Sequence, residues 1–217
     1  MIAQSILTGQ MQNGGYNLHV PEEFQFVASH VALDFANTLD NRYKPEKAVD
    51  LLGTYGDLLR FCRQAGLLSV HAASRLAKHV SSNDAEAALE RGRDLREALE
   101  RIFQARARGE RASMLDLHAL NRNLQEALKH RKIVECDGHF EWEWEYLDKD
   151  ATAPIWPIAL AAAELLASDQ VNHVAACRDQ TCRWLFLDTS KNHSRRWCDM
   201  KTCGNRNKAK RYYSRAE

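Results

Sequence analysis

"CRDQTCRWLFLDTSKNHSRRWCDMKTCGNR", residues 177–206, is the most informative stretch of this chain. It contains four of the six cysteines, arranged as two pairs with four residues inside each pair and fifteen between them. The pairs are Cys177 with Cys182 and Cys198 with Cys203. Four thiolates in two close pairs suit tetrahedral Zn²⁺, and a zinc ion with four protein ligands is structural and not catalytic. The spacing therefore predicts one structural Zn²⁺ held by these four cysteines.

Two other interpretations of the segment compete with a four-cysteine zinc site. His193 is a rival metal ligand, but it lies in the turn-rich sequence TSKNHS, away from both cysteine pairs. A redox role for the cysteines is the second, but the segment contains no Cys-x-x-Cys motif. Structural zinc is therefore the favoured interpretation.

The residues around the cysteines predict a folded module and not a metal-binding loop without secondary structure. The sequence RWLFLD (183–188) is typical of a strand, and RRWC (195–198) follows the turn, so we expect these two segments to pair as a hairpin. The residues after Cys203 are compatible with a helix. A metal site, a hairpin and a helix that opens at the last ligand predict a small, treble-clef-like zinc finger.

Charge is distributed unevenly along the 217 residues, although the formal net charge is only +1. From Cys177 to the end there are eleven Lys and Arg against four Asp and Glu, whereas residues 1–176 carry nineteen against twenty-five. A basic tail on an acidic body favours a polyanion as partner. The alternative is that the basic end is only solvated and contacts no specific partner. The candidate nucleic-acid-binding residues are Arg195, Arg196, Arg206, Lys208, Lys210, Arg211 and Arg215. Arg206 has an equally good alternative role, which is to support the zinc site.

The residues before the cysteine segment predict a mainly helical domain with a small antiparallel sheet, so the fold class is α+β. Ser69, Ser81 and Ser113 each precede an apolar stripe at helical spacing and are candidate N-caps. In KIVECDGHFEWEWEYL (132–147), Asp137-Gly138 predicts a hairpin turn. Alternation in the second strand places its aromatic residues on one face, which we expect to cover the helices, with ligand stacking as the alternative.

Composition excludes several classes of protein. No apolar run is long enough to cross a bilayer, and the first residues do not resemble a secretory signal, so a cytoplasmic location is expected. Thiols stay reduced in that compartment, which favours metal binding over disulfides. The sequence offers no glycine-rich phosphate loop, nucleophile motif or metal site with an open position, so we expect no enzymatic activity.

The cysteine segment closely resembles the CGNR zinc finger, which is named for its last ligand and the three residues after it, here Cys203-Gly204-Asn205-Arg206. In that family the four cysteines are the zinc ligands. Such fingers usually follow an ABATE domain, and LDFANTLDNR (33–42) and AAAELLAS (161–168) resemble its signatures. The resemblance implies three parts: a flexible segment over 1–22, an ABATE-like domain over 23–172 and the zinc finger over 173–217.

The resemblance also implies a function, namely DNA binding by the finger of a bacterial stress-induced transcription regulator. A small-molecule sensing role for the N-terminal domain would use Asn37, Thr38 and Arg42, whose alternative role is a satisfied buried turn. The competing hypothesis is a protein-interaction or dimerisation module in which the finger is purely structural. A homodimer is expected if the protein reads symmetric DNA sites.

Overall fold

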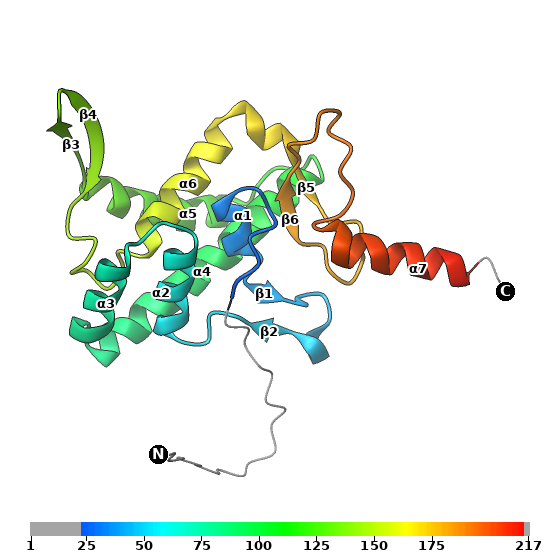
Figure 1. The fold of residues 1–217 in the computed structure, drawn as a ribbon, viewed down its shortest axis with the longest axis horizontal. Helices are drawn as coiled ribbons and strands as arrows, with labels where there is room; N and C mark the ends of the chain where they lie inside the picture. Colours follow the sequence, from blue (N-terminus) through cyan, green and yellow to red (C-terminus); the bar gives the residue numbers. More distant parts are fainter. Residues whose placement is uncertain (1–22, 215–217) are drawn as a thin grey trace, which may run out of the picture.

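The computed structural model describes residues 23–214, so the predicted flexible segment over 1–22 lies outside the described residues (Figure 1). In chain order the elements are α1 Val31–Ala36, β1 Leu39–Asp40, the 3-10 helix η1 Pro45–Lys47, β2 Val49–Asp50, α2 Tyr55–Gln64, α3 Val70–His79, α4 Ser82–Ala107, α5 Met114–Lys129, β3 Arg131–Cys136, β4 His139–Trp144, α6 Ile155–Ala167, the 3-10 helix η2 Asp169–His173, β5 Val174–Ala176, β6 Leu185–Leu187, the π-helix η3 Met200–Gly204 and α7 Asn205–Tyr213. The expected α+β fold, mainly helical with small antiparallel sheets, is confirmed.

The helix starts follow from side-chain capping. Ser69, Ser81 and Ser113 each accept a backbone N–H bond at the beginning of α3, α4 and α5, as the sequence predicts. Each serine satisfies one of the N–H groups that a helix leaves unpaired in its first turn, a contribution of about 1 kcal/mol per cap. These caps fix where the helices of the body begin.

The core is built around α4, the longest helix, which contacts α1, α2, α5 and α6. Leu95, Leu99 and Phe103 form its fully buried stripe. Gly92 lies on the same helix where α2 and α6 approach, and a Cβ there would touch the side chains of Leu58 and Ile155. The glycine therefore lets α2 and α6 pack close to the central helix. No helix within residues 23–214 is long and apolar enough to cross a membrane.

The β3–β4 hairpin turns at Asp137-Gly138 as predicted, with both residues at positive φ. The expectation that its aromatic face covers the helices is wrong, because Phe140 and Trp142 are 72% and 61% exposed. The hairpin projects away from the helices at one end of the molecule (Figure 1). Trp144 at its base packs near Trp156 of α6.

The strand expected in RWLFLD is present as β6, but the predicted pairing with residues 195–198 is wrong. β6 pairs with β5, which lies immediately before Cys177. Its other edge is bonded to the body, where the Leu187 N–H donates to the Ala28 carbonyl and Leu185 binds the Asn37 amide. Both edges of the strand are therefore occupied, and residues 195–198 cannot pair with it.

The finger and the helical body share one hydrophobic core. Leu185 and Phe186 of β6 have no exposed surface and belong to the same buried cluster as Leu33 and Leu99. The chain boundary predicted between residues 172 and 173 falls inside η2, and apolar packing continues across it. The finger is therefore held against the body and does not hang from a linker.

Candidate metal centre and basic surface

The four cysteines of the finger converge on one point. Cys177 follows β5, Cys182 ends a tight turn, Cys198 precedes η3 and Cys203 lies within it. Their sulfur atoms all lie within 4.8 Å of one another, with Cys182–Cys198 and Cys198–Cys203 separations of 3.5 and 3.6 Å. Zn–S bonds of about 2.3 Å in a tetrahedron require sulfur separations of about 3.8 Å. The arrangement therefore fits one zinc ion, as predicted.

The electrostatics of the cluster also favour a cation. Hydrogen bonds from the thiols of Cys182 and Cys198 hold the pKa of Cys177 far below its usual range. The same interactions with Cys177 raise the pKa values of Cys182 and Cys198, and burial raises that of Cys203. Four thiolates at this separation repel one another, so only a divalent cation among them stabilises all four charges.

Asp179 organises the turn between the first two ligands. Its buried carboxylate accepts bonds from the Thr181 N–H and hydroxyl, at 3.0 and 2.7 Å, and from the Asn207 amide at 2.9 Å. Burial opposes ionisation of Asp179, but the hydrogen bonds outweigh it and lower its pKa. The Asn207 amide also donates to the Cys203 carbonyl at 2.9 Å. Sequence reasoning missed both residues, although Asn207 lies one helical turn after the last ligand.

Arg206 has a contact that supports the zinc site and is also accessible from solvent. Its guanidinium lies 3.5 Å from the Asp179 carboxylate, while half of its side-chain surface is exposed. The ion pair ties α7 loosely to the turn that carries Cys182. Because the pairing is long and half exposed, its contribution to stability is small, and the guanidinium is still accessible from solvent.

Arg195 faces inward. Its guanidinium donates to the carbonyls of Val27 and Trp197, at 2.8 and 2.9 Å, and also to that of Cys198. It lies over the Phe186 ring, 4.4 Å from the centroid. The side chain therefore fastens the loop before Cys198 to the N-terminal edge of the body, although its residue type and position in the chain resemble those of its neighbour Arg196.

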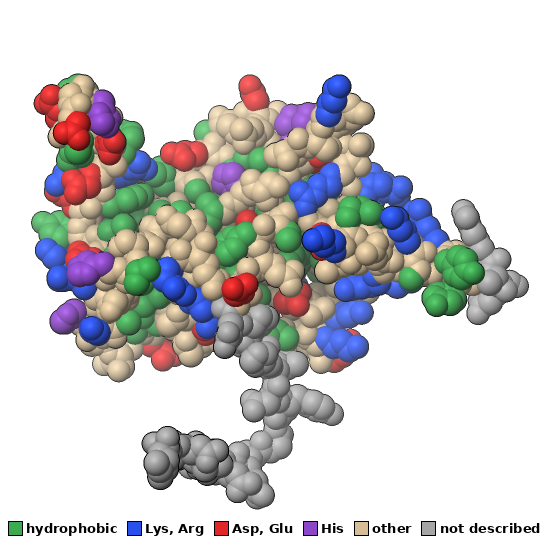
Figure 2. Space-filling model, viewed as in Figure 1, with side chains coloured by type: hydrophobic (Ala, Val, Ile, Leu, Met, Phe, Trp, Pro, Cys, Tyr) green, Lys and Arg blue, Asp and Glu red, His purple; other side chains and the backbone are tan. Residues whose placement is uncertain are grey.

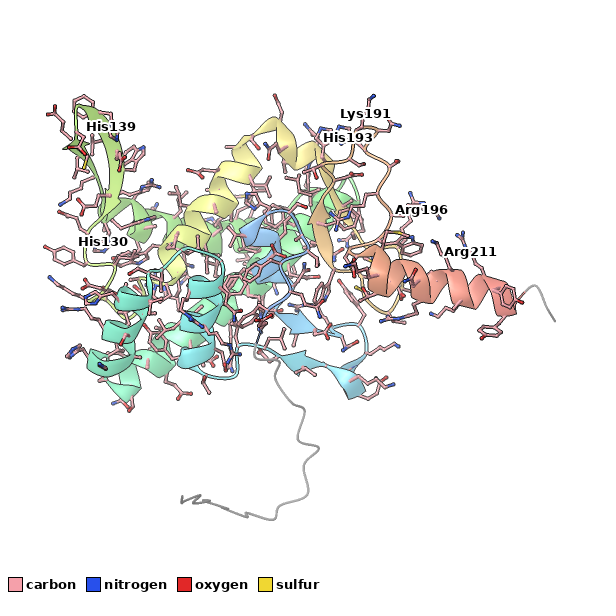
Figure 3. All side chains as sticks on the ribbon, in the orientation of Figure 1. His130, His139, Lys191, His193, Arg196 and Arg211 are labelled. Atoms are coloured by element: carbon pink, nitrogen blue, oxygen red, sulfur yellow. The ribbon has the colours of Figure 1, made fainter. Side chains whose placement is uncertain are left out.

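The remaining candidate nucleic-acid residues form an exposed set. Arg196, Lys208, Lys210 and Arg211 are exposed, and Arg215 lies outside the described residues. Figure 3 shows Arg196 on the finger loop and Arg211 on α7 at the same end of the molecule. In Figure 2 the Lys and Arg side chains gather at this end, and acidic side chains gather on the hairpin at the other.

The three candidate effector residues make contacts within the fold. The Asn37 amide exchanges two hydrogen bonds of 2.9 Å with the backbone of Leu185, and Thr38 donates to a backbone carbonyl one turn earlier. Arg42 forms an ion pair with Glu97. These contacts match the alternative interpretation, in which the segment is a satisfied buried turn.

A cavity of about 10 Å³ lies beside Asn37 and Arg42, at the junction of body and finger. The Oε1 atom of Gln104 and the Nε1 atom of Trp184 are buried without a hydrogen-bond partner, and both residues line this cavity. The volume suits a single water molecule that pairs with both groups. It is far too small for a metabolite.

His193 lies outside the metal cluster, in agreement with the sequence prediction. Its ring stacks on His173 with centroids 3.7 Å apart, and its Nδ1 atom lies 2.9 Å from the Asp188 carbonyl. Asp188 is a second buried carboxylate that the sequence did not single out; it accepts from the Ser190 hydroxyl and the Arg195 N–H. The histidine therefore helps to fix the loop that follows β6.

Two family models match the chain. Residues 29–169 match ABATE, described as "Putative stress-induced transcription regulator", and residues 173–216 match the CGNR zinc finger. A comparison with curated proteins found no match. Since the first model covers more than half of the residues and the second covers the four clustered cysteines, this chain belongs to the ABATE family and carries a C-terminal CGNR zinc finger.

Proposed function

We propose that this protein is a cytoplasmic DNA-binding transcription regulator without catalytic activity, and that α7 carries the surface that contacts DNA. The observation that supports this most strongly is the charge of α7. The helix contains four basic residues and no acidic one, all four are exposed, and it buries none of its residues. The Arg206–Asp179 pair is the one ion pair that the described side chains of α7 make.

A helix with the composition of α7 needs contacts outside the helix to be stable. Nine residues are too few for a stable isolated helix, and α7 has no apolar face packed on the body. It begins directly after Cys203, and Asn207 bonds to that ligand's carbonyl. The negative zinc–thiolate centre lies at the positive end of the helix dipole, and Lys210 and Arg211 lie in its last turn. Zinc therefore anchors α7 and sets its direction.

The geometry of α7 suits contact with a nucleic acid. The helix projects from the finger at the end of the molecule opposite the hairpin (Figure 1). Its basic side chains neutralise phosphates and release counterions, and its exposed Tyr212 and Tyr213 offer aromatic faces to sugars or bases. Arg196 on the adjacent loop extends the basic surface. Arg195 has no part in this surface, because its guanidinium is occupied by backbone carbonyls.

Salt-dependent binding tests the proposal. Fluorescence anisotropy of a labelled random-sequence duplex is measured from 50 to 200 mM salt with the zinc-loaded protein, the triple variant Lys208→Gln, Lys210→Gln, Arg211→Gln, and a matched control. The control is Arg63→Gln, Lys78→Gln, Arg122→Gln, which removes the same charge from exposed positions of the body. We expect the slope of log K against log salt to flatten by about 3 in the α7 variant and to stay unchanged in the control.

Two results contradict the proposal. One is the absence of salt-sensitive binding by the zinc-loaded protein, and the other is an equal loss of affinity in both triple variants. Chelation of zinc provides a further test, because loss of the metal should abolish duplex binding together with the helical signal of α7. Binding that survives chelation removes the role assigned to zinc.

The alternative function, a protein-interaction or dimerisation module, is favoured by a different observation. Phe140 and Trp142 expose most of their surface on the projecting hairpin, and exposed aromatic groups often mark interaction sites. In this alternative the finger only supports the fold, and the α7 variant keeps full function. Light scattering of the purified protein decides whether the expected homodimer forms, and Trp142→Ser tests whether the hairpin mediates it.

Sensing of a small molecule through Asn37, Thr38 and Arg42 is not part of the proposal. An effector bound there would have to displace the Asn37–Leu185 and Arg42–Glu97 contacts.

A further inference from the structure

A pocket of about 520 Å³ lies between the body and the finger, separate from the small cavity near Asn37. The end of α4 and Asn172 of η2 form its body side, and β5 with residues 177–183 and 188–195 of the finger closes the other side. Its volume is in the range of pockets that bind small molecules. Its charged and titratable lining residues are Arg108, Arg178, Arg183, Arg195, Asp188, His173, His193 and the metal ligand Cys177.

The single acid in this lining does not offset the arginines. The Asp188 carboxylate is buried and already accepts bonds from Ser190 and from the Arg195 N–H. Burial opposes the ionisation of Asp188, but these hydrogen bonds outweigh the effect of burial and lower its pKa. The carboxylate is therefore ionised and already hydrogen-bonded. The pocket therefore has a basic lining, because the Asp188 carboxylate is already hydrogen-bonded within its own loop.

Not all four arginines can serve a ligand. The Arg195 guanidinium binds carbonyls, and that of Arg183 lies over the Tyr43 ring, 5.2 Å from its centroid. Arg108 pairs with Glu110 through Nε only, and both side chains are about half exposed, so the pair is weak. The side chain of Arg178 has no hydrogen-bond or ion-pair partner within residues 23–214. Arg108 and Arg178 are therefore the cations left for a ligand, one from the body and one from the finger.

We infer that this pocket binds a phosphate group, held between Arg108, which caps the C-terminal end of α4, and Arg178 of the finger. Guanidinium groups bind phosphate through two parallel N–H bonds, and the His173 ring lines the same pocket. The rings of His173 and His193 stack on each other in this pocket, His173 at the end of η2 and His193 in the loop after β6. A phosphate bound between the two arginines links the end of α4 to the finger.

A phosphate bound by Arg178 would also be connected to the exposed basic surface of the finger. The Arg178 N–H donates to the Arg196 carbonyl at 3.0 Å, so the residue that binds phosphate also fixes the backbone of an exposed arginine. The phosphate comes either from a small phosphorylated molecule or from the DNA backbone, and the chemistry of recognition is the same. The inference does not depend on the proposed DNA binding, because the pocket can be titrated without DNA.

Isothermal titration calorimetry with inorganic pyrophosphate tests the site, next to anisotropy with a random-sequence duplex. The proteins are the zinc-loaded wild type, Arg108→Gln, Arg108→Gln with Arg178→Gln, and a control with Arg63→Gln and Arg122→Gln. Zinc content confirms that each variant keeps its finger, and the single Arg108→Gln variant, distant from the cysteines in sequence, guards against a folding defect. We expect the double variant to weaken pyrophosphate binding at least about tenfold and the control to leave it unchanged.

The two titrations separate the sources of phosphate. Loss of pyrophosphate binding with unchanged duplex binding supports a small phosphorylated ligand. Weaker duplex binding in the double variant than in the control, without pyrophosphate binding by the wild type, supports a DNA phosphate in the pocket. Values equal to those of the wild type in both titrations overturn the inference. Failure of duplex binding in every protein overturns the proposed function alone, since the pyrophosphate titration still decides on the pocket.

Discussion

The side-chain amide of Asn37 pairs with the backbone of Leu185 as a neighbouring strand would. Its Nδ2 atom donates to the Leu185 carbonyl and its Oδ1 atom accepts from the Leu185 N–H, both at 2.9 Å. The two residues are 148 positions apart, and both are buried. One amide thus pairs with the edge of β6 at Leu185 and joins the end of α1 to the strand that lies between the two cysteine pairs.

Replacement of Asn37 by alanine should destabilise the whole protein. The variant leaves the N–H and carbonyl groups of Leu185 buried without partners, at a cost of about 1–3 kcal/mol for each group. We expect the free energy of unfolding in urea to fall by about 2–6 kcal/mol, with both helical and finger signals lost in one transition. Asn121→Ala, an exposed change on α5, is the matched control and should leave stability within about 0.5 kcal/mol. An Asn37→Ala protein as stable as the control would remove the role assigned to this amide.

Arg195 and Arg196 are adjacent in sequence and should respond differently to the same substitution. Arg195→Gln loses the bonds to the carbonyls of Val27 and Trp197 and the stacking on Phe186, so we expect a melting temperature several degrees lower and faster loss of zinc to a chelator. Arg196→Gln removes an exposed side chain and should leave both quantities unchanged while weakening duplex binding.

Differential scanning fluorimetry, a colorimetric zinc-release assay and anisotropy measure these three properties. The variants serve as controls for each other because they change the same charge in the same loop. If both lose stability equally, or if Arg195→Gln alone weakens DNA binding at full stability, the assignment of one residue to the fold and the other to the surface is wrong.

The metal site could be predicted from sequence because its ligands are close in the chain and their chemistry is specific. Two cysteine pairs limit the metal and its geometry without knowledge of the fold. The three serine caps and the Asp137-Gly138 turn were predictable for the same reason, since each acts over a few residues.

Several of the contacts that the sequence missed join distant segments. Nothing in residues 183–198 indicates that β6 has its edges occupied by β5 and by Asn37, and so a local hairpin was the natural prediction. Arg195 and Arg196 look alike in sequence, and only the position of the Val27 carbonyl separates them. The exposed aromatic face of the hairpin was missed because alternation shows that a strand has two faces but not whether either one is covered.

Asp34 should give the protein an unusual dependence of stability on pH. The carboxyl lies buried in α1, where burial raises its pKa to about 7, against the opposing effects of the Ala28 and Val27 N–H groups and of Arg195. In the unfolded chain the pKa of an aspartate is about 3.9, so between these values the folded protein holds a proton that the unfolded chain has lost. Stability from this group is therefore present at low pH and decreases as pH rises toward 7, by up to about 1.4 kcal/mol per pH unit.

Asp34→Asn removes this titration while its amide oxygen can still accept the Ala28 N–H. We expect urea unfolding between pH 6 and 8 to show a variant that gains on the wild type as pH rises, with the difference levelling off above about pH 8. The zinc thiolates contribute with the opposite sign, because metal binding releases protons, but they are common to both proteins and cancel in the difference. A difference that is constant with pH, or one that shrinks as pH rises, would show that Asp34 is already ionised in the folded protein. The pKa assigned to this carboxyl would then be wrong.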